Sequence, residues 1–185
     1  MKKIIALVLA VWMIFSLSGC SENMTSAERF LLAVKKMDFA SMKNELVADA
    51  KLGSLYWKLD SDLALEEESQ IALRNLYALV RYTMGEISEE NATEKTVEIT
   101  LKVPDMKRIR EQVKAKVMAS SGTAETIVGE MISDGTIEKT MILESTISVK
   151  MTKTDDGEWK IPYAANKNLA EALAIEDMID FFVRY

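Results

Sequence analysis

The apolar residues of this 185-residue chain change their spacing once, near Tyr82, and that change limits the folds available to it. Before Tyr82, apolar residues recur every three or four positions, as on one face of an α-helix. After it they alternate with polar residues, most clearly in residues 97–103, which predicts a strand with one buried and one exposed face. Helices followed by strands predict an α+β fold, with N-terminal helices packed on an antiparallel sheet.

The first helices are marked by their capping residues. Thr25 with Glu28 three positions later is a capping box, so a helix is predicted to begin at this point. Asp38 is expected to end that helix and to cap a second one over residues 39–50, which Gly53 closes. A third helix is predicted to start near residues 60–61, and three residues form its apolar face: Ile71, Leu76 and Leu79.

The first strand carries an irregularity. By strand parity, Tyr82 and Met84 point to one face and Ile87 to the other, and Gly85 lies between them. One extra residue in a strand changes this parity, so the sequence predicts a β-bulge at Gly85.

Helices and a hairpin are predicted after this sheet region begins. Asp105 is expected to cap a helix, Thr123 begins another, and residues 137–143 fit either a helix or a strand. A turn at residues 155–157 then leads into a strand that places Trp159 and Ile161 on the buried face. Asn168 and Glu171 predict the start of a closing helix, whose inner face is formed by Ala172, Ile175, Ile179 and Phe182.

The first twenty residues predict an export signal. Two lysines precede an apolar segment over residues 4–17 that is too short to span a bilayer. It ends in Leu17-Ser18-Gly19-Cys20, which resembles the lipobox of bacterial lipoproteins, where the cysteine carries a diacylglycerol. Two acyl chains would make membrane attachment effectively permanent. We therefore expect a lipid-anchored protein on the extracytoplasmic face of the cell membrane.

The predicted organisation is simple. Residues 1–19 form the lipoprotein signal peptide, residues 20–24 a lipidated leader, and residues 25–185 a single domain. Without residues 1–19 the chain has 21 basic and 29 acidic residues, a net charge of −8. This balance argues against nucleic-acid binding. Cys20 is the one cysteine of the sequence, so no disulfide is possible.

The order of elements and the segment Asp156-Gly157-Glu158-Trp159-Lys160-Ile161 resemble the NTF2-like, cystatin-like superfamily, especially its small lipid-anchored bacterial members, many of them domains of unknown function. The resemblance covers residues 25–161. It implies a curved antiparallel sheet wrapped around helices, with a pocket at the concave face. The segment of residues 120–143 and the C-terminal helix are additions to that plan.

The composition restricts the chemistry. There is no histidine, so imidazole bases and histidine metal sites are excluded, and we expect no catalytic residue, metal or cofactor. Burial could turn a carboxylate into a proton carrier, and the candidates are Asp49, Asp60 and Glu86, but capping or surface roles explain them better.

Two non-catalytic functions remain. The first is a protein-interaction module that binds a protein partner or forms a homodimer. The alternative is a binder of a small apolar or amphiphilic ligand in the concave pocket, for which methionine and aromatic side chains are suited. The candidate pocket residues are Tyr56, Trp57, Tyr82, Met84 and Trp159.

Overall fold

The computed structural model describes residues 24–47, 66–119 and 122–184. Before the sheet it has helices α2 (Ser26–Lys36), α3 (Phe39–Asn44) and α5 (Glu67–Ala78). The sheet consists of β1 (Arg81–Asn91), β2 (Glu94–Pro104), β3 (Ile142–Lys153) and β4 (Trp159–Lys160). Between β2 and β3 lie α6 (Met106–Ala119), α7 (Ala124–Ser133) and α8 (Thr136–Thr140). The chain closes with η1 (Tyr163–Ala165), α9 (Lys167–Ala172) and α10 (Ile175–Arg184). The predicted α+β fold, with its helical insertion and C-terminal helix, is confirmed.

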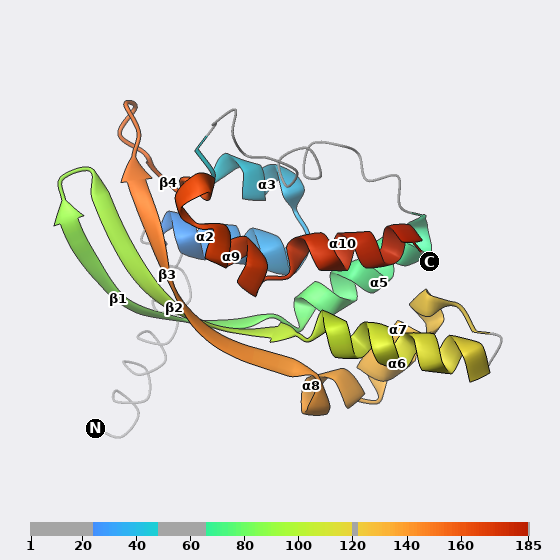
Figure 1. Cartoon of the computed structure of the whole chain (residues 1–185). Helices are drawn as coiled ribbons and strands as arrows, with labels where there is room; N and C mark the ends of the chain where they lie inside the picture. Colours follow the sequence, from blue (N-terminus) through green and yellow to red (C-terminus); the bar gives the residue numbers. More distant parts are fainter. Residues whose placement is uncertain (1–23, 48–65, 120–121, 185) are drawn as a thin grey trace, which may run out of the picture.

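The sheet is antiparallel, with strand order β1-β2-β3-β4. It curves strongly, and α2 and α9 lie on its concave side (Figure 1). β2 supplies the centre of this face, because its four alternating apolar side chains are between 0% and 3% exposed: Val97, Ile99, Leu101 and Val103. The polar residues between them point to the convex face, so the predicted alternation is confirmed.

The predicted bulge at Gly85 is also confirmed. Met84 pairs with Ile99, and Ile87 pairs with Val97. Between these two pairs β1 has two residues and β2 has one, so β1 contains one extra residue. A Cβ on Gly85 would lie 3.0 Å from the carbonyl oxygen and 3.2 Å from the Cβ of Glu98. The close approach of β2 therefore favours glycine at this point.

The helix starts follow their capping residues. Thr25 accepts a hydrogen bond from the Glu28 amide, and Asp38 accepts one from the Ser41 amide. The Asp105 carboxylate caps α6, and Thr123 caps α7. Each bond satisfies an amide that has no partner within the first turn, so these local signals determine where the helices begin.

The second helix is shorter than predicted. It ends at Asn44, and Leu46 instead forms a parallel bridge with Ile161. The Ile161 amide donates to the Glu45 carbonyl, and the Val47 amide donates to the Ile161 carbonyl. These tertiary hydrogen bonds replace the helical ones that would have continued α3. Gly53, which was expected to close the helix, lies outside the described residues.

The apolar face of α5 is rotated from the predicted one. Leu76 is fully buried, but Ile71 is 48% exposed, and the buried side includes Ala72, Leu73 and Tyr77. Residues 60–61, where the helix was expected to start, lie outside the described residues.

The closing helix is two helices. Asn168 is not its cap, because α9 begins at Lys167, and the Asn168 side chain donates to the Ser148 carbonyl. Ala174 then adopts a left-handed backbone, with φ of 49°, and separates α9 from α10. Of the predicted inner face, Ile175 and Phe182 are buried. The undecided segment 137–143 divides between α8 and the start of β3.

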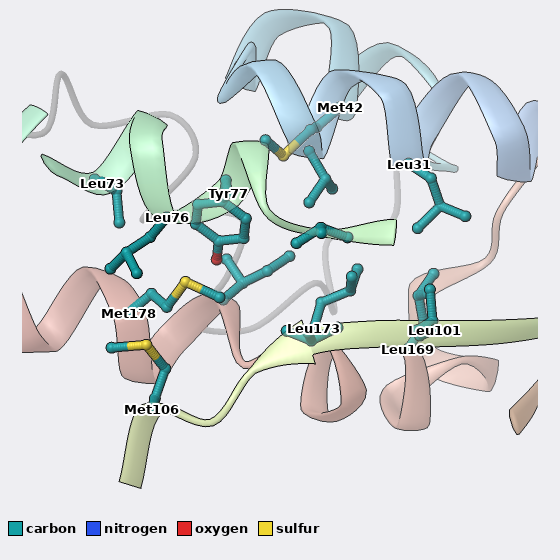
Figure 2. Close-up of a cluster of buried hydrophobic side chains, with 14 of the residues drawn as sticks. Leu31, Met42, Leu73, Leu76, Tyr77, Leu101, Met106, Leu169, Leu173 and Met178 are labelled. Carbon is teal, nitrogen blue, oxygen red and sulfur yellow. The ribbon is translucent and has the colours of Figure 1, made fainter. Parts of the chain in front are cut away.

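The core lies between the concave face and the helices. Figure 2 shows side chains of α2, α3, α5, β2 and the C-terminal helices meeting there. Tyr77 is completely buried within this cluster, and its hydroxyl has no hydrogen-bond partner among the described residues. Within the same residues, no helix is long and apolar enough to cross a bilayer.

Candidate functional site

Trp159 lies at the end of the core. The predicted turn is present, since the Gly157 amide donates to the Thr154 carbonyl and Gly157 has φ of 89°. Ile161 is fully buried as expected, but Trp159 is only half-buried. The prediction that its indole points into the interior is therefore met only in part, because the side chain packs against the core from its edge. The reason is its register, because Trp159 pairs with Lys153, which lies two residues beyond Met151, the last buried residue of β3.

A groove of about 400 Å³ lies beside this indole, and we call it the Trp159 groove. All four strands contribute to it, together with the start of α2 and the β3–β4 turn. Its walls are Met24, Thr25, Ser26, Arg29, Ile87, Lys95, Met151, Gly157, Glu158 and Trp159. Both apolar and charged side chains line the groove, which suits an amphiphilic or peptide surface better than a purely apolar molecule.

The cation on β2 is held against the aromatic ring. Lys95 places its Nζ 4.7 Å from the centroid of the Trp159 ring and 2.8 Å from the Glu89 carboxylate. The hydrogen bond from Lys95 lowers the pKa of Glu89. A cation over an indole contributes about 0.5–1 kcal/mol at an exposed site. The contact therefore orients both side chains without leaving the lysine free for an anion.

The cation on α2 is also paired. Arg29 makes a bidentate contact with Glu45, 2.8 Å from Nε to one carboxylate oxygen and 2.8 Å from Nη2 to the other. Its Nη1 donates to the carbonyl of Met24, two residues before α2, which fixes the chain at the start of the helix. The hydrogen bond with Glu45 raises the pKa of the Arg29 guanidinium. With both cations neutralised by carboxylates, the groove is not an anion site.

The predicted pocket residues are only partly brought together. Tyr82 and Met84 face the same concave side as Trp159, but both pack against the core and neither lines the groove. Burial raises the pKa of the Tyr82 hydroxyl, and the charge of Glu28 adds to this effect. Tyr56 and Trp57 lie outside the described residues.

Sequence reasoning missed Ile87, Lys95 and Met151. The signal that identifies Ile87 is the bulge, since the extra residue in β1 turns Ile87 to the concave side. Lys95 and Met151 pair directly with each other, so only the β2–β3 register places them beside Trp159.

The displaced carboxyl pKa values of the described residues all lie on the same side of their ordinary values. Wherever a carboxyl pKa is displaced, it is displaced downward, for example by the side-chain hydrogen bond from Ser41 to Asp38 and by that from Lys150 to Glu94. A general acid at neutral pH needs the opposite displacement. Glu86 is exposed on β1, while Asp49 and Asp60 lie outside the described residues. In the same part of the chain, no group of three or more His, Cys, Asp or Glu residues is placed to hold a metal.

Comparison with known proteins adds a single structural likeness. No family model and no curated protein matches the chain. The structure is similar to the crystal structure of a Bacillus subtilis protein described as a "putative lipoprotein (ycdA)", at 20% sequence identity and a TM-score of 0.38. The likeness covers 77% of this chain and 44% of the other, so the chain spans less than half the length of that protein.

Proposed function

We propose that the chain is a lipoprotein anchored through Cys20 to the outer face of the cell membrane. The observation that carries this proposal is Leu17-Ser18-Gly19-Cys20 at the end of an apolar segment with a basic start. Leucine, two small residues and cysteine at this place are what lipoprotein maturation requires.

Fractionation and mass spectrometry test the anchor. Wild-type protein should partition into the detergent phase of membranes, and its N-terminal peptide should begin at Cys20 with an added diacylglycerol. Cys20→Ala should abolish both the acyl mass and the processing at residue 20, whereas Ser21→Ala should change neither. Detergent-phase Cys20→Ala protein with an unchanged processed mass would refute the proposal.

We further propose that the domain is a non-catalytic interaction module of the NTF2-like type. Helices that precede a curved antiparallel sheet and pack on its concave face support this relationship. The centre of the concave face is filled by buried side chains of α2, α5 and the C-terminal helices, which leaves the rim of this face and the outer surfaces for recognition. The downward displacement of carboxyl pKa values also supports a role without acid–base chemistry.

The Trp159 groove favours a second candidate function, the binding of an amphiphilic ligand. Its half-buried indole, with Ile87 and Met151 beside it, offers an apolar floor. Tryptophan emission of the mature protein, recorded in a Trp57→Phe background, should then shift on titration with short-chain amphiphiles. Ile87→Ser should weaken the response and Ile71→Ser, an exposed site on α5, should leave it unchanged. An emission spectrum that does not respond would refute ligand binding at this groove.

A further inference from the structure

The outer edge of β1 is unpaired within the described part of the chain. β1 is an end strand of the sheet and bonds only to β2. Nine of its eleven residues are exposed, the exceptions being Tyr82 and Met84. A long exposed edge presents amides and carbonyls that can accept another strand.

The bulge gives β1 an unusual internal symmetry. In a regular strand, residues an odd number of positions apart point to opposite faces. Because of the bulge, Met84 and Ile87 lie opposite Ile99 and Val97 and therefore share the concave face. Thr83 and Ser88 lie opposite Thr100 and Thr96 in the same way and share the convex face. Residues equally distant from the Gly85–Glu86 centre thus point to the same side.

This symmetry makes β1 complementary to itself. When two copies of β1 run antiparallel about the Gly85–Glu86 centre, Met84 meets Ile87 and Thr83 meets Ser88. Each Glu86 then lies opposite a glycine rather than a second carboxylate. Directly opposed apolar or hydroxyl pairs stabilise antiparallel strands.

The charges at the two ends of β1 match in the same register. Arg81 meets Glu90, which a second irregularity of β1 leaves without a partner on β2 and whose carboxylate contacts Thr96 on the convex face. Tyr82 meets Glu89 on the concave face. The side chains of Arg81, Glu89 and Glu90 are 53%, 69% and 44% exposed. Within its own chain, Arg81 donates from Nη1 to the Ala78 carbonyl, while its Nη2 lies 3.8 Å from Glu138. Glu90 lies 3.8 Å from Lys150 and accepts a hydrogen bond from Thr96. The two ion-pair contacts of 3.8 Å are exposed and contribute little stability, so they compete only weakly with an ion pair between Arg81 and Glu90 of two copies.

We propose that β1 is the interface between two copies of this chain, paired antiparallel about Gly85–Glu86 so that their sheets join edge to edge. This inference rests on the proposed function, because it names the partner of the interaction module and uses its lipid anchor. A single strand edge buries less surface than a stable soluble dimer needs, so pairing depends on the concentration that a shared membrane provides.

The geometry of the pair is compatible with two anchored chains. The two-fold axis of an antiparallel strand pair runs perpendicular to the sheet. Both copies therefore keep α2 on the same side of the joined sheet, and their Met24 residues lie at the same height along the axis. Two chains held in one membrane leaflet require this relation.

Cysteine cross-linking tests the register in the full-length lipoprotein in membranes. Thr83→Cys and Ser88→Cys chains are expressed together and exposed to a mild oxidant. Directly opposed residues lie about 4.5–5.5 Å apart at Cα, within the range of a disulfide. Either variant expressed alone should not cross-link. In the proposed register Thr83 of one copy is about 17 Å along the strand from Thr83 of the other, and the same holds for Ser88. A Thr100→Cys and Ser148→Cys mixture, on the convex face of β2 and β3 and so outside the proposed strand pair, is the matched control.

Charge reversal tests the complementarity. Arg81→Glu or Glu90→Arg, introduced into both cysteine chains, should lower the cross-linked fraction about five-fold, and the combination should restore it. Lys102→Glu with Glu144→Lys reverses an exposed ion pair on β2 and β3 and should have no effect.

The outcomes separate the dimer from the anchor. If the mixed cysteine chains stay in the membrane fraction but do not cross-link, or each alone cross-links as well as the mixture, the dimer is refuted. In that case the bulge and the glutamates of β1 prevent its exposed edge from pairing with another chain, and the protein is a monomer. If the chains leave the membrane fraction, the anchor itself is refuted, and the dimer with it.

Discussion

Replacement of Asn166 by alanine should destabilise the protein more than almost any other polar substitution in the described residues. Asn166 is 1% exposed and uses both ends of its amide. Its Oδ1 accepts from the Lys150 amide at 2.7 Å, and its Nδ2 donates to the carbonyls of Lys150 and Pro162 at 2.9 Å and 2.8 Å. β4 covers β3 only at Thr152 and Lys153, so the Asn166 amide takes the place of the next strand at Lys150.

The magnitude follows from these three bonds. A typical hydrogen bond contributes about 1 kcal/mol net, and a buried group left without a partner costs about 1–3 kcal/mol. Lys150 is only partly buried, so water can replace part of the loss. We therefore expect a loss of about 3 kcal/mol in the free energy of unfolding, or about 6–12 °C in Tm for a domain of this size.

Urea unfolding of the mature protein in detergent micelles, followed by circular dichroism, measures the loss. Hydrogen exchange at the Lys150 amide should accelerate in the same variant, which a general loss of packing would not single out. Asn168→Ala is the matched control, because Asn168 is exposed and makes one bond of 3.2 Å to the Ser148 carbonyl. Equal losses for the two variants would show that β3 does not depend on the Asn166 amide.

Four other substitutions give distinct expectations. Tyr77→Phe removes a buried hydroxyl that has no hydrogen-bond partner among the described residues, so stability should stay equal or rise by up to about 1 kcal/mol, and a loss of stability would reveal a partner for the hydroxyl. Gly85→Ala should cost about 1–3 kcal/mol in urea unfolding, because its Cβ would press against the Glu98 backbone, and an unchanged midpoint would refute a tight bulge. Trp159→Ala should cost only about 1–2 kcal/mol, since the indole is half-buried, and complete unfolding would contradict this placement. Asp38→Ala should cost about 1 kcal/mol at neutral pH through the lost α3 cap. The hydrogen bond from Ser41 lowers the pKa of Asp38, so wild type loses this advantage as the pH falls through that lowered pKa, and urea midpoints of both proteins against pH should converge in acid.

Features that depend on neighbouring residues were predictable from the sequence. The caps at Thr25, Asp38 and Thr123 use side chains three positions from the amides they bind. The alternation of β2 and the bulge at Gly85 likewise follow from spacing within one strand. Local geometry alone determines these features, so no knowledge of the partner elements was needed.

Features that depend on distant residues were predicted less well. The apolar spacing of Met42 and Leu46 fits a continuing helix, but Leu46 is bound to Ile161, more than a hundred positions away. The closing helix has a regular apolar face, yet Ala174 breaks it with a left-handed backbone. Periodicity records which side chains are buried, and it does not record where the backbone changes direction to bury them.

The Trp159 groove and the proposed dimer edge both depend on one local feature, the extra residue of β1 at Gly85. In a regular strand, Ile87 would point to the convex face and would leave the floor of the groove. The same regular strand would place Ser88 on the concave face, opposite in direction to Thr83, and would remove the self-complementary pairing. The parity of β1 was readable from the sequence, whereas the two surfaces that it creates required the register of all four strands. A strand irregularity of a single residue thus determines what both the concave face and the open edge of this sheet can contact.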